Sequence, residues 1–313
     1  MQLLFIIDPP ETLKAYKDTT VSMMRAAQAR GHAVSVCGQE SLAWRDGEVT
    51  AESLGIVLSD RDDDWFKEQD RARRTLQSFD AVLMRKDPPF DLEYVTSTWL
   101  LSAAERRGAR VFNAPVAIRD HNEKLAIAEF PQFVAPTLVS RDPDQLHAFI
   151  DAQHDVIVKR LDSMGGESIF RVGAADPNRN VIVETMVGAS ERSVMAQRYI
   201  PEIRDGDKRI LLIDGKPVPY SLARIPKPGE SRGNLAAGGR GVAQPLSPRD
   251  LEIAQRVGET LAARGLLLVG LDVIGDWLTE VNVTSPTCFR EIQDQTGLDV
   301  ASLFVDALEA RLR

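Results

Sequence analysis

The segment from Leu3 to Cys37 carries the pattern that most constrains the fold of this chain. Leu3–Ile7 is a continuous apolar run, which is typical of a buried parallel strand. A helix can follow, with Asp18 or Thr19 as its N-cap and Gly31 as its C-terminal stop. Ala33–Cys37 is a second short apolar strand. A strand, a helix and a strand at this spacing form a βαβ unit, which predicts a doubly wound α/β sheet.

The rest of the chain supplies further strands and helices. A composition shift near Asn113–Asp120 marks an expected domain boundary. The expected strands are Ala81–Arg85, Arg110–Phe112, Val134–Val139, Val156–Lys159, Ser168–Val172, Val181–Thr185, Val194–Ile200 and the two strands beside the hairpin turn at Asp214-Gly215. The expected helices are Val95–Arg107, Pro143–Ala152, Arg249–Arg264 and Val300–Arg311, and the charged run Asp60–Arg74 is interpreted as a solvated helix face.

Composition and charge exclude several classes of protein. The chain has 313 residues and a net charge of −8, so we expect neither a nucleic-acid binder nor a membrane-surface binder. No stretch reaches the apolar length of a membrane span. The first apolar run ends at Asp8 without a basic flank, so we interpret it as a strand and not as a signal peptide. Cys37 and Cys288 match no zinc spacing, which favours buried thiols and a cytoplasmic location.

A hairpin near the C-terminus, Leu266–Glu291, contains a candidate metal site. An apolar run carries Asp272, a tight turn follows at Gly275-Asp276, and a second run carries Glu280 and Asn282. Glu280 and Asn282 share a face because they are two residues apart on one strand, and the turn can bring Asp272 near them. Oxygen ligands of this kind suit a hard divalent cation such as Mg²⁺. The same spacing also fits a surface hairpin with scattered polar residues, and spacing alone does not separate the two.

Two glycine-bearing segments are candidates for phosphate binding. Lys159 ends an apolar strand and is followed by Gly165 and Gly166, which would let backbone N–H groups approach a phosphate; the alternative is an ordinary turn beside a surface lysine. Pro226–Gly241 holds five glycines and three basic residues, among them Arg232. A segment of this length within a compact domain favours a lid that closes over phosphates, with a linker as the alternative.

Several arginines become candidates only in combination with these segments. Arg209 and Arg224 lie on the two strands of the Asp214-Gly215 hairpin, where they could neutralise a transferring phosphoryl group. Arg85 ends a strand of the first domain, where it could hold a substrate carboxylate. The segment after the first strand contains no G-x-G-x-x-G motif, so a nicotinamide-dependent dehydrogenase is not favoured.

The order of these motifs resembles that of the ATP-grasp ligases. More closely, five segments together resemble the prokaryotic glutathione synthetase family, and the resemblance covers the chain from its first strand to its last helix. These segments are LMRKDPPFD, RDHNEKL, KRLDSMGG, SLARIPKPGESRGNLAAGGRG and LTEVNVTSPTCFREI. The resemblance implies an α/β protein with the ATP-grasp fold. It implies an N-terminal Rossmann-like domain at 1–122, an ATP-grasp lid subdomain at 123–200, and a C-terminal subdomain at 201–313 with the metal site and the glycine-rich loop.

The resemblance also implies an activity and a set of site residues. The activity is ATP-dependent joining of γ-glutamylcysteine to glycine through an acyl phosphate, with Mg²⁺ as cofactor, Mn²⁺ as an alternative ion, and assembly into a homotetramer. The implied metal ligands are Asp272, Glu280 and Asn282. The implied ATP-binding residues are Lys124, Lys159, Gly165, Gly166, Gln197, Tyr199, Ile200 and Asp207. Of these, Gln197, Tyr199 and Ile200 belong to the hinge Gln197–Ile200, which matches the adenine site of the family. Arg209, Arg224 and Arg232 are assigned to catalysis, and Arg85 and Arg232 to substrate carboxylates.

Two other functions on the same fold fit the sequence. One is a different carboxylate–amine ligase, which would join other amino acids. The other is a non-catalytic ATP-binding protein, against which the complete set of Asp272, Glu280 and Asn282 counts. Product analysis with γ-glutamylcysteine and glycine would separate the first, and ADP release would separate the second.

Overall fold

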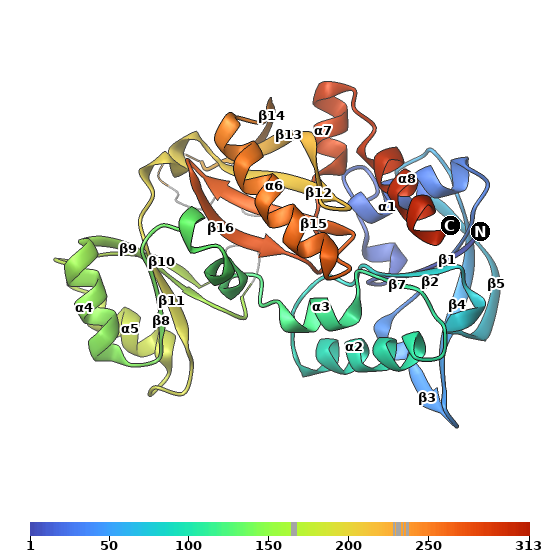
Figure 1. The fold of residues 1–313 in the computed structure, drawn as a ribbon, viewed down its shortest axis with the longest axis horizontal. Coiled ribbons are helices and arrows are strands. Elements are labelled where there is room, and N and C mark those ends of the chain that lie inside the picture. Colours follow the sequence, from blue (N-terminus) through green and yellow to red (C-terminus); the bar gives the residue numbers. More distant parts are fainter. Residues whose placement is uncertain (164–167, 228, 230–232, 234, 236–237) are drawn as a thin grey trace.

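Three β-sheets follow one another along the chain (Figure 1). The computed structural model describes residues 1–163, 168–227, 229, 233, 235 and 238–313. Within these residues the sheets have seven, four and five strands, and they are called sheets A, B and C in chain order. Figure 1 shows sheet A at one end of the molecule, sheet B with its two helices at the other end, and sheet C between them. None of the helices in these residues is long and apolar enough to cross a membrane.

Sheet A contains the predicted βαβ unit. The first strand pairs in parallel with the second and with β6, and Asp18 caps the intervening helix by accepting a hydrogen bond from the Val21 N–H at 2.8 Å. The strand order is β3-β4-β2-β1-β6-β7, with β5 paired to β4. The strands are β1 (Gln2–Ile6), β2 (Ala33–Cys37), β3 (Ala43–Arg45), β4 (Glu48–Leu58), β5 (Phe66–Thr75), β6 (Ala81–Met84) and β7 (Val111–Phe112).

Helices cover both faces of sheet A, and side chains of β1 alternate between the two cores. Leu3 and Phe5 pack in a core with α1 and α8, whereas Leu4 and Ile6 pack in a core with α2 and α3. This alternation explains why a strand that is buried on both faces has a continuous apolar sequence. The helices are α1 (Thr19–Ala29), α2 (Leu92–Glu105), α3 (Pro115–Asp120) and α8 (Val300–Leu312).

The prediction of a helix at Asp60–Arg74 is wrong. Phe66–Thr75 form the edge strand β5, which pairs antiparallel with β4, and residues 60–65 lie outside any helix or strand. Most of its side chains are exposed, so the strand has no apolar alternation by which a sequence could reveal it. Charged side chains on an edge strand also discourage pairing with another chain. Charge alone therefore did not distinguish a solvated helix face from an edge strand.

Sheet B is a four-stranded antiparallel sheet with two helices on one face. Its order is β10-β9-β11-β8, and α4 and α5 pack over Val156, Val158, Val194 and Ala196. The alternate residues of β9 and β11, among them Lys159, therefore face the other way. The elements are β8 (Thr137–Ser140), α4 (Pro143–Gln153), β9 (Asp155–Arg160), β10 (Ile169–Gly173), α5 (Arg179–Val187) and β11 (Val194–Arg198).

The prediction of a strand at Val181–Thr185 is wrong, because these residues lie within α5. Val183, Met186 and Val187 are its buried side chains, and their spacing of three and four residues is that of a helix face. A short run that contains β-branched residues fits both a strand and a buried helix, and the predicted stretch ended before Met186.

Sheet C is a five-stranded antiparallel sheet in the order β14-β13-β12-β15-β16. The predicted hairpins at Asp214-Gly215 and at Gly275-Asp276 both form within it. Its elements are β12 (Asp207–Ile213), β13 (Lys216–Ile225), β14 (Arg240–Pro245), α6 (Pro248–Ala263), β15 (Leu268–Ile274), β16 (Trp277–Asn282) and α7 (Phe289–Thr296). The short 3-10 helices of the chain are η1 (Pro10–Thr12), η2 (Gln39–Ser41), η3 (Leu76–Ser78), η4 (Leu125–Glu129), η5 (Pro131–Phe133) and η6 (Pro201–Asp205).

Two glycines let helix α6 approach the turn between β12 and β13. A Cβ atom on Gly258 would overlap the carbonyl oxygen of Gly215. Gly215 itself has a φ of +75° and would bring a Cβ to 2.8 Å from the Cβ of Ala262. Neither side of this contact has room for a side chain.

We predict that Gly258→Ala destabilises the protein, although alanine is the better helix former by about 1 kcal/mol. The added methyl group must push α6 away from sheet C, at a cost of about 1–3 kcal/mol as for other overpacked positions. Urea denaturation would measure the loss. Glu259→Ala on the exposed face of the same helix is the control, and an unchanged or higher stability of Gly258→Ala would contradict the prediction.

Candidate active site

Cross-strand pairing collects charged side chains on one face of sheet C. Asp272 of β15 pairs with Arg209 of β12 on one side and with Glu280 of β16 on the other. Asp207 pairs with Arg224 in the neighbouring hairpin, two residues from Arg209. Directly paired residues project to the same face of a sheet, so register alone places these five side chains together. The expectation that Asp272 and Glu280 lie near each other is confirmed.

Two arginines surround the carboxylate of Asp272. Arg209 Nε lies 2.5 Å from Asp272 Oδ1, and Arg224 Nη2 lies 2.9 Å from Asp272 Oδ2. All three side chains are buried. Burial by itself would raise the pKa of Asp272, but the two guanidinium groups hold this pKa below its usual range. Arginines on strands are usually exposed, so the burial of Arg209 and Arg224 separates them from ordinary surface residues.

Asp207 is the second carboxylate beside Arg224. Arg224 Nη2 donates to Asp207 Oδ2, whereas Asp207 Oδ1 is buried and has no hydrogen-bond partner among the described residues. Burial raises the pKa of Asp207 to about 7 in spite of the nearby Arg224.

The predicted metal ligands form a donor set that suits a hard cation bound jointly with phosphate. The set consists of the carboxylates of Asp272 and Glu280 and the amide of Asn282. Asp272 and Glu280 are directly paired, and Asn282 lies two residues beyond Glu280 on β16, opposite Gly270. The Asn282 Nδ2 donates to the Gly270 carbonyl at 3.2 Å, so its oxygen is the atom that can ligate a cation. No group of three His, Cys, Asp or Glu side chains that could hold a metal occurs in the part of the chain that the structure describes. Phosphate oxygens would have to complete the coordination, as is usual for Mg²⁺.

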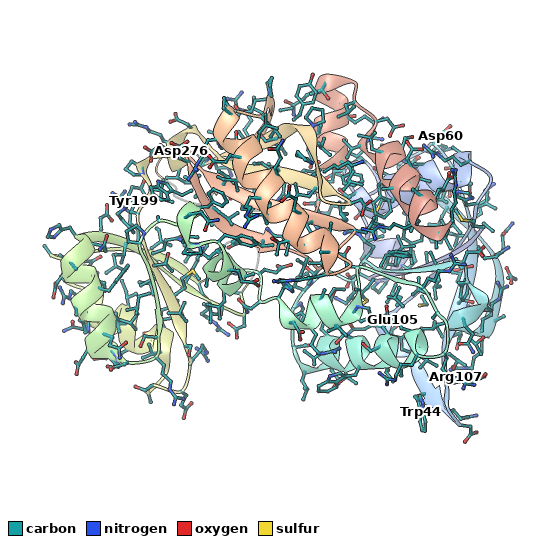
Figure 2. All side chains as sticks on the ribbon, in the orientation of Figure 1. Trp44, Asp60, Glu105, Arg107, Tyr199 and Asp276 are labelled. Atoms are coloured by element: carbon teal, nitrogen blue, oxygen red, sulfur yellow. The ribbon has the colours of Figure 1, made fainter. Side chains whose placement is uncertain are left out.

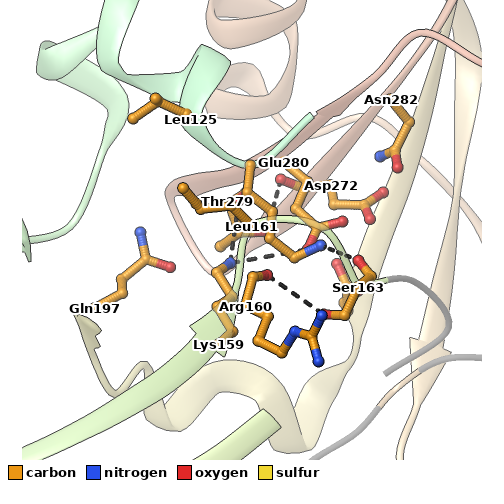
Figure 3. A network of polar contacts seen from close by, with 12 residues as sticks. Leu125, Lys159, Arg160, Leu161, Ser163, Gln197, Asp272, Thr279, Glu280 and Asn282 are labelled. Atoms are coloured by element: carbon orange, nitrogen blue, oxygen red, sulfur yellow. Dashed lines mark hydrogen bonds and ion pairs between the residues drawn. The ribbon is translucent and has the colours of Figure 1, made fainter. Parts of the chain in front are cut away.

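Two lysines from different segments converge on Glu280, and Figure 3 shows one of them, Lys159, beside it. Lys124 Nζ and Lys159 Nζ each lie 3.8 Å from Glu280 Oε1. Lys159 Nζ also donates to the Thr279 carbonyl at 3.4 Å, and Lys124 Nζ donates to the Ser163 carbonyl. Burial lowers the pKa of Lys159, although Glu280 opposes this shift. Two desolvated ammonium groups beside a carboxylate are suited to receive the phosphates of a nucleotide.

The three predicted hinge residues differ in what their side chains contact. Gln197 is buried, and it lies on the same face of β11 as Met195, which pairs with Lys159. The Gln197 Nε2 donates to Thr137 Oγ1 at 2.9 Å. The guanidinium carbon of Arg171 lies 3.7 Å from the centroid of the Tyr199 ring. Figure 2 shows Tyr199 at the outer side of the molecule. Ile200 is buried. Gln197 thus shares a face of sheet B with Lys159.

A cavity of about 250 Å³ lies where these segments meet. Arg85 does not line it. This buried arginine donates to Thr20 Oγ1 at 3.1 Å and to the Pro286 carbonyl at 3.0 Å, so it supports the cavity wall from behind. The lining residues are Asp87, Pro88, Glu123, Lys124, Ser163, Arg209, Arg224, Leu235, Asp272, Glu280, Asn282, Thr284, Ser285, Pro286, Thr287 and Cys288.

Some predicted site residues lie outside the described part of the chain. These are Gly165, Gly166 and Arg232. Of the predicted lid, Gly233 is buried and Leu235 lines the cavity. A Cβ on Gly233 would overlap the Arg224 carbonyl oxygen, so this glycine packs directly on the strand that carries Arg224.

Sequence reasoning missed several residues that line the cavity, notably Glu123 and the segment Thr284–Cys288. Glu123 precedes Lys124, but nothing in the spacing shows that it turns toward the cavity. Cys288 has a φ of +96°, which is rare for a residue with a side chain, at the N-terminus of α7. The NVTSPT segment was noted only as a marker of family resemblance.

Comparison with known proteins agrees with this geometry. Residues 1–119 match the family model described as prokaryotic glutathione synthetase, N-terminal domain, and residues 123–297 match prokaryotic glutathione synthetase, ATP-grasp domain. The chain belongs to the prokaryotic glutathione synthetase family. Glutathione synthetase of Ralstonia nicotianae is 60% identical over 99% of this chain and 95% of its own length. Glutathione synthetase of Bordetella parapertussis is 61% identical over 99% of both chains, and that of Nitrosomonas europaea is 56% identical.

Solved structures show the fold of this glutathione synthetase family member. D-cycloserine synthetase DcsG has a TM-score of 0.68 at 15% identity and covers 99% of this chain and 100% of its own. A RimK domain protein ATP-grasp from Sphaerobacter thermophilus has a TM-score of 0.64 at 19% identity, with the same coverage. The prediction of an α/β protein with the ATP-grasp fold is therefore confirmed.

We predict that both cysteines of the native protein resist alkylation at pH 8. Cys37 and Cys288 are buried. Burial raises the pKa of the Cys37 thiol to about 12 and raises that of Cys288 as well, so neither forms the reactive thiolate near neutral pH. Intact-mass analysis after iodoacetamide treatment should show two additions in urea and none without it. Rapid labelling of native Cys288 would contradict this burial.

Proposed function

We propose that this chain is an ATP-dependent ligase that joins γ-glutamylcysteine to glycine and yields glutathione, ADP and phosphate. The near full-length identity of about 60% to glutathione synthetases supports the reaction. The observation that carries the site assignment is the meeting of Lys124 and Lys159 at Glu280, beside Asp272 and its two arginines. Such a set of cations and oxygen donors is what phosphoryl transfer from a nucleotide requires.

The reaction proceeds in two steps that need no covalent enzyme intermediate. A carboxylate oxygen of the cysteinyl residue attacks the γ-phosphorus of ATP, and the bond between that phosphorus and ADP breaks. The glycine amine then attacks the acyl carbon, the bond from this carbon to the phosphate oxygen breaks, and the amine loses a proton. The residues of the chain therefore act by positioning and by charge stabilisation.

Each group of residues has a distinct part in these steps. We assign Lys124 and Lys159 to the phosphates of ATP, and Arg209 and Arg224 to the negative charge that develops on the transferring group and on the tetrahedral intermediate. Mg²⁺, with Mn²⁺ as an alternative, would neutralise phosphate charge when it is bound by Asp272, Glu280 and Asn282. Further assignments are the Gln197–Ile200 hinge, with Gln197, Tyr199 and Ile200, to adenine, Asp207 to the nucleotide, Gly165 and Gly166 to phosphate, and Arg232 to catalysis and to substrate carboxylates. Arg85 does not line the cavity, so we assign it to support of the cavity wall through the Pro286 carbonyl.

The proposal extends to the units of the chain. We assign substrate binding to the domain at 1–122, and nucleotide binding to the units at 123–200 and 201–313. The segment Pro226–Gly241 would exclude water, which otherwise hydrolyses the acyl phosphate. We further propose a homotetramer in the cytoplasm that uses no nucleic acid or membrane.

Phosphate release tests the function directly. We predict that the purified protein releases phosphate only when γ-glutamylcysteine, glycine, ATP and Mg²⁺ are all present, because each step needs the product of the previous one. Mass spectrometry should identify the product as glutathione. Equal turnover with D-alanine pairs would indicate a different carboxylate–amine ligase, and ATP binding without ADP release would indicate a non-catalytic protein.

The metal assignment has its own test. We predict that Glu280→Gln and Asn282→Ala each lower turnover about 10²-fold or more, because charge stabilisation at the phosphates is lost. Steady-state kinetics across a range of Mg²⁺ concentrations would measure this loss. Glu259→Gln on the surface of α6 is the matched control, and near-normal turnover of both site variants would refute the assignment.

A further inference from the structure

Glu123 bonds to the segment that follows strand β16. Its side-chain Oε1 accepts hydrogen bonds from the Val283 N–H at 2.9 Å, the Thr284 N–H at 3.1 Å and the Thr284 hydroxyl at 2.9 Å. Its backbone carbonyl accepts a fourth hydrogen bond, from the Val281 N–H at 2.8 Å. One residue thus makes four hydrogen bonds to the four-residue stretch 281–284.

This stretch and its neighbours carry the metal-binding oxygens. Val281 and Val283 flank Asn282, and Glu280 directly precedes them. Both valines are fully buried, so the strand cannot shift toward solvent without loss of packing. Hydrogen bonds to its backbone therefore fix where the side chains of Glu280 and Asn282 lie.

On its other side, Glu123 is bonded covalently to Lys124. The Lys124 ammonium lies 3.8 Å from Glu280 Oε1, and Glu123, Lys124 and Glu280 all line the cavity. Glu123 thus connects Lys124, to which it is covalently bonded, with the strand that carries Glu280 and Asn282. A carboxylate that accepts backbone N–H bonds forms stronger bonds than a neutral acceptor, which suits it to this task.

A second side chain holds the same segment from the N-terminal sheet. The Asn113 Nδ2 donates to the Val283 carbonyl at 2.8 Å and to the Leu268 carbonyl at 2.7 Å. Its Oδ1 accepts from the Leu268 N–H at 2.9 Å. Asn113 therefore ties the segment to the start of β15, whereas Glu123 ties it to the lysine. Of the two, Glu123 is the one that joins two functional groups of the site.

We propose that Glu123 is a positioning residue that sets the spacing between Lys124 and the metal-binding pair Glu280 and Asn282, and so determines how tightly the site binds Mg²⁺ with ATP. The inference rests on the proposed function for the identity of the nucleotide. It adds a role for a residue that is not among the metal ligands and phosphate-binding residues assigned above. Outer partners that orient metal ligands typically change metal affinity 10–100-fold when they are replaced.

The test compares Glu123→Ala, Glu123→Gln and Thr284→Val. Alanine removes all three side-chain bonds, glutamine keeps an acceptor oxygen without the charge, and Thr284→Val removes only the hydroxyl donor. We expect the dissociation constant of ATP in the presence of Mg²⁺ to rise about tenfold for Glu123→Ala and less for the other two. Fluorescence titration with a labelled ATP analogue, at several Mg²⁺ concentrations and without other substrates, would measure it.

The matched control is Glu129→Ala. This glutamate lies six residues further along, in a surface ion pair with Arg264 at 2.6 Å, and its loss should leave nucleotide binding unchanged. A merely structural role of Glu123 would lower the melting temperature and the active fraction, with no change in Mg²⁺ dependence. Wild-type affinity and wild-type Mg²⁺ dependence in Glu123→Ala would overturn the proposal.

Two further outcomes keep the proposals separate. If Glu123→Ala does not fold, Glu123→Gln and Thr284→Val decide: a raised Mg²⁺ requirement in both supports the positioning role, and wild-type binding in both overturns it. If the unmodified protein binds ATP with Mg²⁺ but makes no glutathione, the proposed function fails. The positioning role is then still judged by nucleotide binding alone.

Discussion

The buried contact of Asp272 with Arg209 and Arg224 is the interaction on which the candidate site depends. Two guanidinium groups surround one carboxylate, on a face of sheet C that also carries the carboxylates of Asp207 and Glu280. A buried carboxylate with such partners is tolerated only if the geometry satisfies all of the charges, and removal of one partner typically costs about 3–5 kcal/mol. The arrangement therefore fixes the positions of three side chains at once. It also holds positive charge beside the place where phosphoryl transfer is proposed.

Part of this site could be predicted from the sequence because the period of a strand is two. The turn at Gly275-Asp276 and the spacing of Glu280 and Asn282 were sufficient to place three oxygen donors on one face. The register between β12 and β15, which belong to different hairpins, could not be predicted, because no local pattern indicates that Arg209 pairs with Asp272. The burial of the two arginines follows from that long-range pairing and was therefore beyond local sequence reasoning.

The errors in the predicted fold have the same physical origin. The edge strand β5 is recognisable only once β4 is known to lie beside it, because its own side chains show no apolar face. The helix α5 was mistaken for a strand because its apolar run is short and β-branched. By contrast, the βαβ unit was predicted correctly, since capping, glycine stop and apolar runs are all local signals. Glu123 escaped notice because its partners lie 158 to 161 residues away along the chain.

The packing of α8 against α1 has a consequence for the order in which the chain can fold. The last helix supplies Phe304, Val305 and Leu308 to the same core as the first strand and the first helix (Figure 1). His32 and Glu309 also meet at 2.8 Å. During synthesis, the face of sheet A that α1 and α8 share must therefore stay partly uncovered until α8 has been made. Sheet B and its helices contain their own core and precede α8 in the chain, so sheet A is made before sheet B but is finished after it.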